Sequence, residues 1–270
     1  MKVRGERECT DCGTRWSYYD TGEVACPDCG SLRSVGVERE RRRHTDAPAT
    51  LDLTRFREAV ADAEPTRGTD ADLEGIDEIA ADLGSTLREY LRKRGFIRGG
   101  ELLELDDTYL AARELLEVVD AYRRLREPDE AASLYVLELL EGADDGERPG
   151  TDAVPAQLAP ARGLAVATVV EAYRDELVTY LGDLEEGAAF GGDTSAEEVA
   201  DATDATDDTD VTTVLGKLRD RTKRVRALEG DVDPAEAETL VDAAREIGAY
   251  LREDDLDALA RAHDRLADVV

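Results

Sequence analysis

Two cysteine pairs near the N-terminus constrain the fold of this chain more than any other feature. Each pair has the form C-x-x-C-G, and together they contain every cysteine of the sequence: Cys9, Cys12, Cys26 and Cys29. Two intervening residues let both sulfurs of a pair face one ion, and the glycine that follows permits the positive φ that closes such a turn. The spacing predicts a closed structural zinc site with these four ligands and no open position for a reacting water.

Two disulfides and a rubredoxin-like iron site are the alternatives to zinc. Paired thiols in a chain whose N-terminus lacks the apolar core of a signal peptide favour thiolate ligands over disulfides. The short loop between Cys12 and Cys26 disfavours iron, although C-P-x-C-G also suits that metal. We therefore expect Zn²⁺ as the cofactor.

The residues between and after the pairs predict a small β module. Residues 15–19 alternate like a strand, 20–23 have turn chemistry, 24–25 lead back, and 31–37 alternate again as a third strand. This pattern is typical of a zinc ribbon.

Trp16, the single tryptophan, has two interpretations. It is predicted to share a face of the hairpin with Tyr18, while Tyr19 lies on the other face. An exposed aromatic face beside Arg15 and Arg33 would stack a base or anchor a partner protein. We favour the other interpretation, in which Trp16 or Tyr18 covers the metal site as the minimal core of the module.

The stretch CTDCGTRWSYYDTGEVACPDCG, residues 9–30, resembles the zinc ribbon of the general transcription factor B class, and also an uncharacterised haloarchaeal zinc-ribbon family with a helical body. In the transcription factors this ribbon docks on RNA polymerase. The resemblance covers about residues 5–38, and only the four cysteine ligands carry over. The body from Leu51 onward does not resemble the paired cyclin-like folds of those factors, so polymerase docking is implied by the ribbon alone.

The remainder of the chain has a helical pattern. Apolar residues recur at spacings of three and four, which predicts helices near residues 51–63, 70–94, 105–119, 128–142, 161–186, 211–225, 240–251 and 256–266. Pro128 is predicted at the first position of its helix. The expected fold class is mainly α, with a small N-terminal β zinc ribbon followed by an antiparallel helical bundle.

Composition suggests the domain organisation. We expect the zinc ribbon in residues 1–43, a linker in 44–50 and the helical bundle in 51–270. A segment rich in proline and glycine leaves open a division of the bundle near 142–160. The tract near 187–210 is acidic with few large apolar residues, so it is predicted to be a mobile loop.

The formal net charge is −30, from 64 acidic and 34 basic residues, and only four of the basic residues are lysines. This acidic, lysine-poor composition is typical of proteins from halophilic archaea. Such a field opposes nonspecific nucleic-acid binding, so any nucleic-acid contact must be local. No segment is long and apolar enough to cross a bilayer, and we expect a cytoplasmic protein without membrane contact.

Two basic clusters and two histidines are further candidates. Arg39, Arg41, Arg42 and Arg43 form a run after the ribbon, and the segment 211–230 carries six cations. The arginine run would contact phosphate, and the segment 211–230 would receive nucleic acid or an acidic partner. Pairing with the acidic helices or with the tract 191–210 of the same chain is the simpler interpretation. With four sulfurs available, His44 is not expected to bind zinc, and His263 lies on an apolar stripe as a helix-interface residue.

The sequence contains no phosphate-binding glycine loop, metalloprotease helix or nucleophile motif, so we do not expect an enzyme. The preferred function is a zinc-binding, non-catalytic adaptor associated with transcription through its ribbon, with RNA polymerase as the candidate partner. The alternative is a protein-interaction or structural helical module in which zinc only stabilises the fold and no nucleic acid is contacted.

Overall fold

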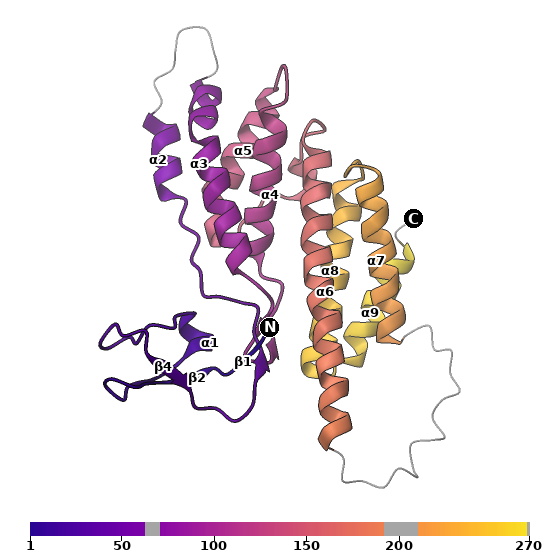
Figure 1. Cartoon of the computed structure of the whole chain (residues 1–270). Coiled ribbons are helices and arrows are strands. Elements are labelled where there is room, and N and C mark those ends of the chain that lie inside the picture. The colour runs from indigo at the N-terminus through magenta and orange to yellow at the C-terminus, as the bar shows by residue number, and fades with distance from the viewer. Residues whose placement is uncertain (63–70, 192–209, 269–270) are drawn as a thin grey trace.

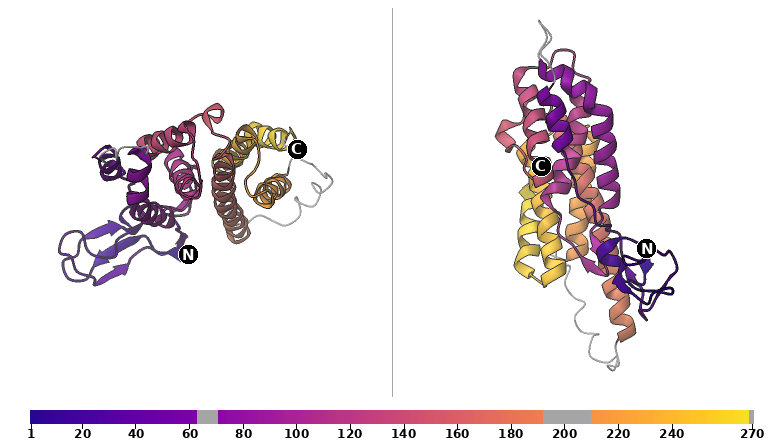
Figure 2. Two further views of the ribbon diagram at one scale, coloured as in Figure 1. Left: turned by 90° about the horizontal axis from the view of Figure 1, so that it is seen from above. Right: turned by 90° about the vertical axis from the view of Figure 1, so that its left-hand side faces the viewer.

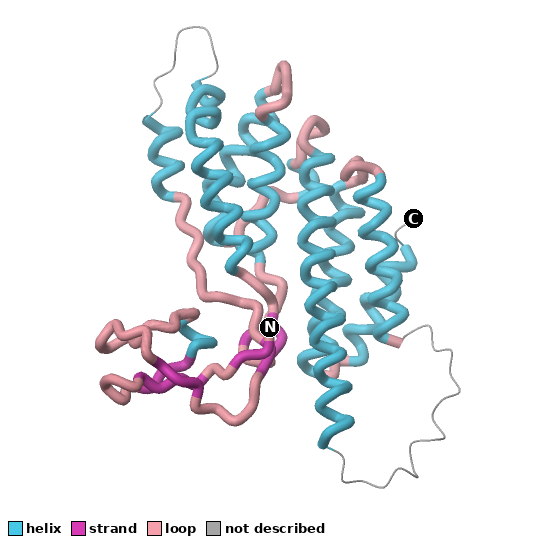
Figure 3. Tube along the Cα trace, viewed as in Figure 1, coloured by secondary structure: helices cyan, strands magenta, loops and turns pink. Residues whose placement is uncertain are grey.

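The computed structural model describes residues 1–62, 71–191 and 210–268 (Figure 1). Its architecture is mainly α with a small N-terminal β region, which confirms the predicted fold class. Figure 3 shows that the strands are confined to that region and to one hairpin beside it. The strands are β1 Lys2–Val3, β2 Glu6–Cys9, β3 Arg15–Ser17, β4 Ser34–Gly36, β5 Arg42–Arg43, β6 Ile97–Arg98 and β7 Glu101–Leu102.

The other regular elements of the described chain are the short helix α1, eight α-helices longer than two turns, and two 3₁₀ turns. In chain order the α-helices after the short α1 Tyr18–Thr21 are α2 Thr54–Asp62, α3 Ala71–Lys93, α4 Asp107–Tyr122, α5 Glu130–Gly142, α6 Ala159–Gly191, α7 Val211–Ala227, α8 Pro234–Glu253 and α9 Leu256–Asp268. The 3₁₀ turns η1 Ala143–Asp145 and η2 Thr151–Ala153 occupy the segment between α5 and α6.

The helices form two side-by-side groups, α2 to α5 and α6 to α9, as the view along their axes shows (Figure 2). Helices α4 and α6 pack against each other between the groups. One cluster of buried apolar side chains runs through both groups, from Leu53 and Leu110 to Val170 and Ile247. The predicted apolar stripes supply this core.

The N-terminal module consists of residues 1–43. The prediction of a hairpin between its two cysteine pairs is wrong. The strand that follows the first pair ends at Ser17, and α1 forms one helical turn that closes at Gly22. The partner of β3 is β2, which precedes the cysteines, and the sheet order is β3-β2-β4 with antiparallel pairing. Residues 24–25 form no strand, while the expected strand in 31–37 is present as β4.

Two predicted helix boundaries also differ. Pro128 does not begin α5, because the Asp129 side chain accepts the backbone N–H of Ala132 and caps the helix at that residue. Helix α6 continues to Gly191, so the first residues of the predicted acidic loop, 187–191, are helical. The rest of that prediction, from residue 192 through residue 209, lies outside the described residues.

Segment 44–50, predicted as a linker, is bound to the helical body. Thr45 N–H donates to the Ile97 carbonyl at 2.8 Å, and Ala47 N–H donates to the Lys93 carbonyl at 2.8 Å. Asp46 is fully buried and receives ion pairs from Arg94 and Arg98. These contacts fix the path of the chain between module and body.

A short hairpin of the body completes this junction. Strands β6 and β7 are joined by Gly99 and Gly100, both at positive φ, which is the backbone of a tight two-residue turn. The Gly100 N–H donates to the Arg43 carbonyl at 2.8 Å, and the Tyr19 ring lies where a side chain on Gly99 would be. This hairpin was not predicted, although Gly99-Gly100 before an apolar run is a turn signal.

The first residues of the chain connect the module to α6. Strand β1 pairs with β5, and Lys2 and Arg43 both form ion pairs with Asp183. Arg43 donates from Nε at 2.6 Å and from Nη2 at 2.9 Å. These hydrogen bonds, helped by Lys2, lower the pKa of Asp183 to about 2.

Replacing Asp183 with asparagine is expected to loosen this junction by about 1 kcal/mol, because the contact is partly exposed and screened by salt. The lowered pKa means that the contribution is present above the usual carboxyl range and is lost as the pH falls from near 4 through about 2. Hydrogen exchange at the amides of Thr45 and Gly100 should accelerate in Asp183→Asn. The matched change Asp175→Asn, on the exposed face of the same helix, should leave exchange unchanged; equal acceleration would contradict the assignment.

Within the three described segments, no helix combines the length and the apolar character needed to cross a membrane.

Candidate metal centre

The two cysteine pairs adopt the same backbone turn. After the first cysteine of each pair, the glycine N–H donates back to that cysteine's carbonyl: Gly13 to Cys9 at 3.0 Å and Gly30 to Cys26 at 2.9 Å. The N–H groups of Cys9 and Cys26 in turn donate to the carbonyls five residues later. Both glycines have positive φ, 78° and 71°, as the sequence predicts. Each turn therefore presents two sulfurs on one side.

The four sulfurs form one cluster. All of them lie within 4.8 Å of one another, with Cys9 to Cys29 at 3.6 Å and Cys12 to Cys26 at 3.5 Å. A tetrahedron with sulfurs about 2.3 Å from its centre has edges of about 3.8 Å, whereas a disulfide needs about 2.05 Å. The donors therefore fit a single ion, and the cluster can bind a metal. A set of four thiolates suits zinc.

Trp16 covers this cluster. The side chain is only 7% exposed and shares a small buried core with Cys9 and Cys26. Its indole N–H donates to the Glu23 carbonyl at 3.0 Å, which closes the segment between the two pairs over the ring. This confirms the interpretation of Trp16 as core rather than as an exposed stacking residue.

Cys12 is exposed at the edge of the cluster. Its sulfur lies 3.3 Å from the Thr14 hydroxyl, and hydrogen bonding by Thr14 lowers the pKa of the thiol to about 6. The thiolate is the form that binds a metal, so Thr14 favours the ligand state of Cys12.

The opposite face of the small sheet is open to solvent. Arg15 and Val35 flank Glu8 across the three strands, and Val37 follows Val35 on the same face. Val35 is 51% exposed and Val37 is 40% exposed. Arg33, at the same side of the chain, is 77% exposed and pairs with Asp11 only at the surface. We call Arg15, Arg33, Val35 and Val37 the outer face.

The other candidate residues of the module have structural positions. Tyr18 and Tyr19 pack on the ring of His44 rather than on the outer face, and the Tyr19 hydroxyl donates to the Val3 carbonyl. Burial lowers the pKa of His44, whose ring nitrogens have no hydrogen-bond partner in the described chain. Within the arginine run, Arg43 is committed to Asp183, while Arg39, Arg41 and Arg42 are exposed.

His263 lies between two helices, as its place on an apolar stripe predicts. Its Nε2 is 2.7 Å from the Lys217 ammonium of α7.

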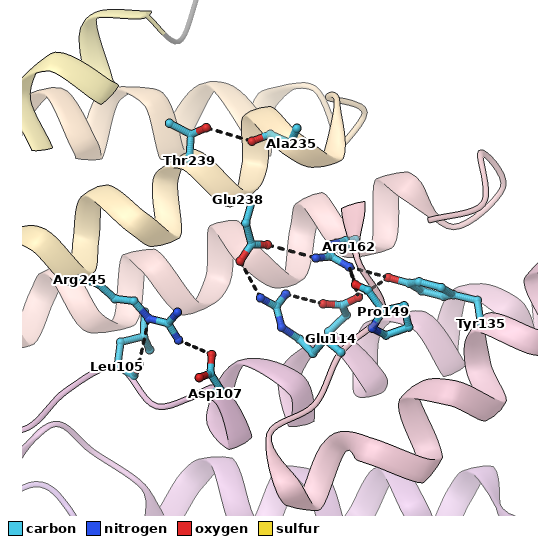
Figure 4. A network of polar contacts seen from close by, with 11 residues as sticks. Leu105, Asp107, Glu114, Tyr135, Pro149, Arg162, Ala235, Glu238, Thr239 and Arg245 are labelled. Atoms are coloured by element: carbon cyan, nitrogen blue, oxygen red, sulfur yellow. Dashed lines mark hydrogen bonds and ion pairs between the residues drawn. The ribbon is translucent and has the colours of Figure 1, made fainter. Parts of the chain in front are cut away.

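A buried charge cluster between the helix groups was not anticipated (Figure 4). Glu114 of α4 is fully buried and accepts from Arg148 at 2.9 Å, from Arg162 at 3.2 Å and from the Tyr135 hydroxyl. The same two arginines bind Glu238 of α8, which closes a ring of alternating charges. Burial disfavours the Glu238 carboxylate, but the two arginines outweigh it and lower its pKa.

This cluster is neutral and internally paired, so its chemistry is that of a structural contact between α4, α6 and α8. A signal for it exists in the sequence. Glu114 follows Leu110 and Ala111 by four and three residues and precedes Val118 by four, which places a carboxylate on an apolar face.

Comparison with known proteins identifies one family. A family model described as a family of unknown function, DUF7117, matches residues 1–191 and 187–266, and the chain belongs to this family. No curated protein and no solved structure matches the chain.

Proposed function

We propose that this member of the DUF7117 family is a zinc-binding, non-catalytic adaptor whose N-terminal module is a zinc ribbon that docks on RNA polymerase. The observation that carries the proposal is that the two faces of the module differ in chemistry. The inner face holds four sulfurs under Trp16, and the outer face exposes Val35 and Val37 between two arginines.

The chemistry of the four-cysteine cluster supports a binding role rather than catalysis. Four sulfur ligands complete a tetrahedral zinc shell, so the ion would have no position for a water or a substrate. Arginine is enriched at protein interfaces, and the exposed valines beside it add apolar area that a partner can bury, while the charges orient the partner.

Polymerase docking is favoured by the resemblance of residues 9–30 to the transcription factor B ribbon. The exposed arginines would face an acidic or mixed surface of the partner. Nucleic acid is the less favoured partner, because a net charge of −30 repels an extended polyanion. We propose a salt-rich cytoplasm as the setting, because the chain is acidic and has few lysines.

A second candidate function is a helical interaction module in which zinc only stabilises the fold. One observation favours it: Tyr18, Tyr19 and β5 are already occupied by contacts with His44, Gly99 and Asp183. Much of the module surface is thus already in contact with the rest of the chain and is not available to a partner.

Charge reversal on the outer face distinguishes docking through the ribbon from the helical interaction module. With tagged protein crosslinked at native salt in a salt-tolerant host, we expect Arg15→Glu/Arg33→Glu to lower polymerase recovery at least tenfold. The matched variant Arg92→Glu/Arg126→Glu, which reverses two exposed arginines of the body, should recover polymerase like the native chain.

Zinc content and Trp16 fluorescence should be unchanged in both variants, because the replaced ion pairs are at the surface. Equal recovery from both variants, or the absence of polymerase from the native sample, would overturn docking through the ribbon. Partners that are lost only in the body variant would favour the helical module.

A further inference from the structure

We propose that the groove between α7 and α9 binds a compact phosphate-bearing anion through Arg221 and Arg224, with Lys217 at its side. This site belongs to the helical body and is independent of the function proposed for the N-terminal module.

The groove is built by two helices. Lys217, Asp220, Arg221 and Arg224 line one side from α7, and Leu266 and Ala267 line the other side from α9, around a volume of about 320 Å³. Lys217, Arg221 and Arg224 are four and three residues apart, so they follow one side of α7 with neighbouring side chains about 5–6 Å apart at Cβ. A ligand with several oxygens can contact more than one of them at once.

The charges of the groove are arranged for an anion. Asp220 is the one carboxylate among the lining residues. It forms an ion pair with Arg219 at 2.9 Å, so its negative charge is already compensated. Arg221 and Arg224 form no ion pair with any described residue, although the chain carries far more acids than bases. Arg226 of the same helix, by contrast, pairs with Glu171. Within the described residues, both guanidinium groups therefore keep their donors for a ligand, and they line the same groove.

Lys217 is held in place by a residue of the opposite helix. Its ammonium donates to Nε2 of His263 at 2.7 Å, and Nδ1 of the same ring faces Asp264 at 3.4 Å. This arrangement keeps the imidazole as an acceptor toward Lys217 and keeps the positive charge at the mouth of the groove.

The class of ligand follows from the geometry of the arginine side chains and from the electrostatic potential of the acidic body. Guanidinium groups bind phosphate oxygens bidentately, and two arginines and a lysine match the charge of a diphosphate. An extended nucleic acid would place its further phosphates over the acidic body, whereas a compact ligand experiences only the local potential. We therefore assign the groove to a diphosphate group, either free or as part of a nucleotide.

Titration calorimetry with pyrophosphate and with ADP tests the site in the full chain, at the lowest salt at which circular dichroism shows a folded protein. We expect saturable binding of one ligand per chain, weakened at least tenfold by Arg221→Gln/Arg224→Gln. The control Arg226→Gln/Arg261→Gln removes two cations that are already paired, one from each of the two helices, and changes no residue of the groove lining, so its affinity should stay within twofold of the native value.

Binding of ADP more tightly than pyrophosphate would identify a nucleotide as the source of the phosphate, and equal binding would identify free diphosphate. The proposal is overturned if neither ligand binds saturably, or if both double variants lose affinity equally, since that pattern indicates general charge attraction. Tighter binding of a twelve-nucleotide single-stranded RNA, lost in Arg221→Gln/Arg224→Gln, would also overturn it in favour of a nucleic-acid surface.

Discussion

Removing the metal with a strong chelator is expected to unfold the N-terminal module and to leave the helical body folded. The module has only three residues in its buried core, Cys9, Trp16 and Cys26, which cannot offset the ordering entropy of some forty residues. Zinc binding to four thiolates supplies about 10–16 kcal/mol of apparent folding free energy. The body has its own continuous core and does not depend on the ion.

Trp16 reports this change directly, because it is the one tryptophan of the chain and packs on two of the ligands. Chelation should shift its fluorescence to the red while the far-ultraviolet helix signal is retained. Cys26→Ser should show the same spectrum without chelator, and Asp28→Ser, an exposed change between two ligands, should behave like the native chain. Metal analysis of the purified protein distinguishes zinc from iron. A buried Trp16 in the metal-free chain would contradict the assignment.

The second large effect is expected at Glu114. Glu114→Gln leaves Arg148 and Arg162 buried with only Glu238 as a counter-charge. An uncompensated buried charge of this kind costs about 3–5 kcal/mol, which is a large part of the stability of a typical domain. Denaturant unfolding followed by helix circular dichroism should show the loss. Glu117→Gln on the same helix, whose partner Arg113 is 3.8 Å away, should change stability by less than about 0.5 kcal/mol.

A double substitution tests whether charge balance is the cause. Glu114→Leu/Arg162→Met removes one charge of each sign and leaves Arg148 paired with Glu238. We expect the double variant to be less destabilised than the sum of its single changes, because neither remaining charge is unpaired. Additive losses would mean that packing, and not charge balance, sets the role of Glu114.

The helices and the cysteine cluster could be predicted from the sequence because each depends on residues that are close together in the chain. The helices were predictable because their apolar stripes repeat with the helical period and the core selects that face, as for Leu83 and Leu87 of α3. The cysteine cluster was predictable because the spacing within each pair and the following glycine determine the turn. Neither inference requires knowledge of a distant segment.

Several of the missed features depend on contacts that no single stretch of the sequence shows. Strand β2, with the sequence EREC, has no apolar alternation, and its pairing with β3 and β4 depends on the cysteine turn that begins at Cys9. The end of β3 at Ser17 reflects Tyr19, whose ring packs at Gly5 and at Gly99, two residues of different segments. The sequence indicated the cations of residues 211–230, but the groove between α7 and α9 needs both helices, and a single helical pattern does not specify that neighbour.

Helix α6 spans the whole architecture without interruption. It carries Arg162 of the buried charge cluster near one end and Asp183 of the module junction near the other, about 30 Å apart along its axis. A continuous helix has no residue that absorbs a large change in backbone angle, so it cannot act as a hinge. Force applied to the N-terminal module by a bound partner would therefore load α6 as a rigid lever and reach the contact between the helix groups, instead of being dissipated in a loop.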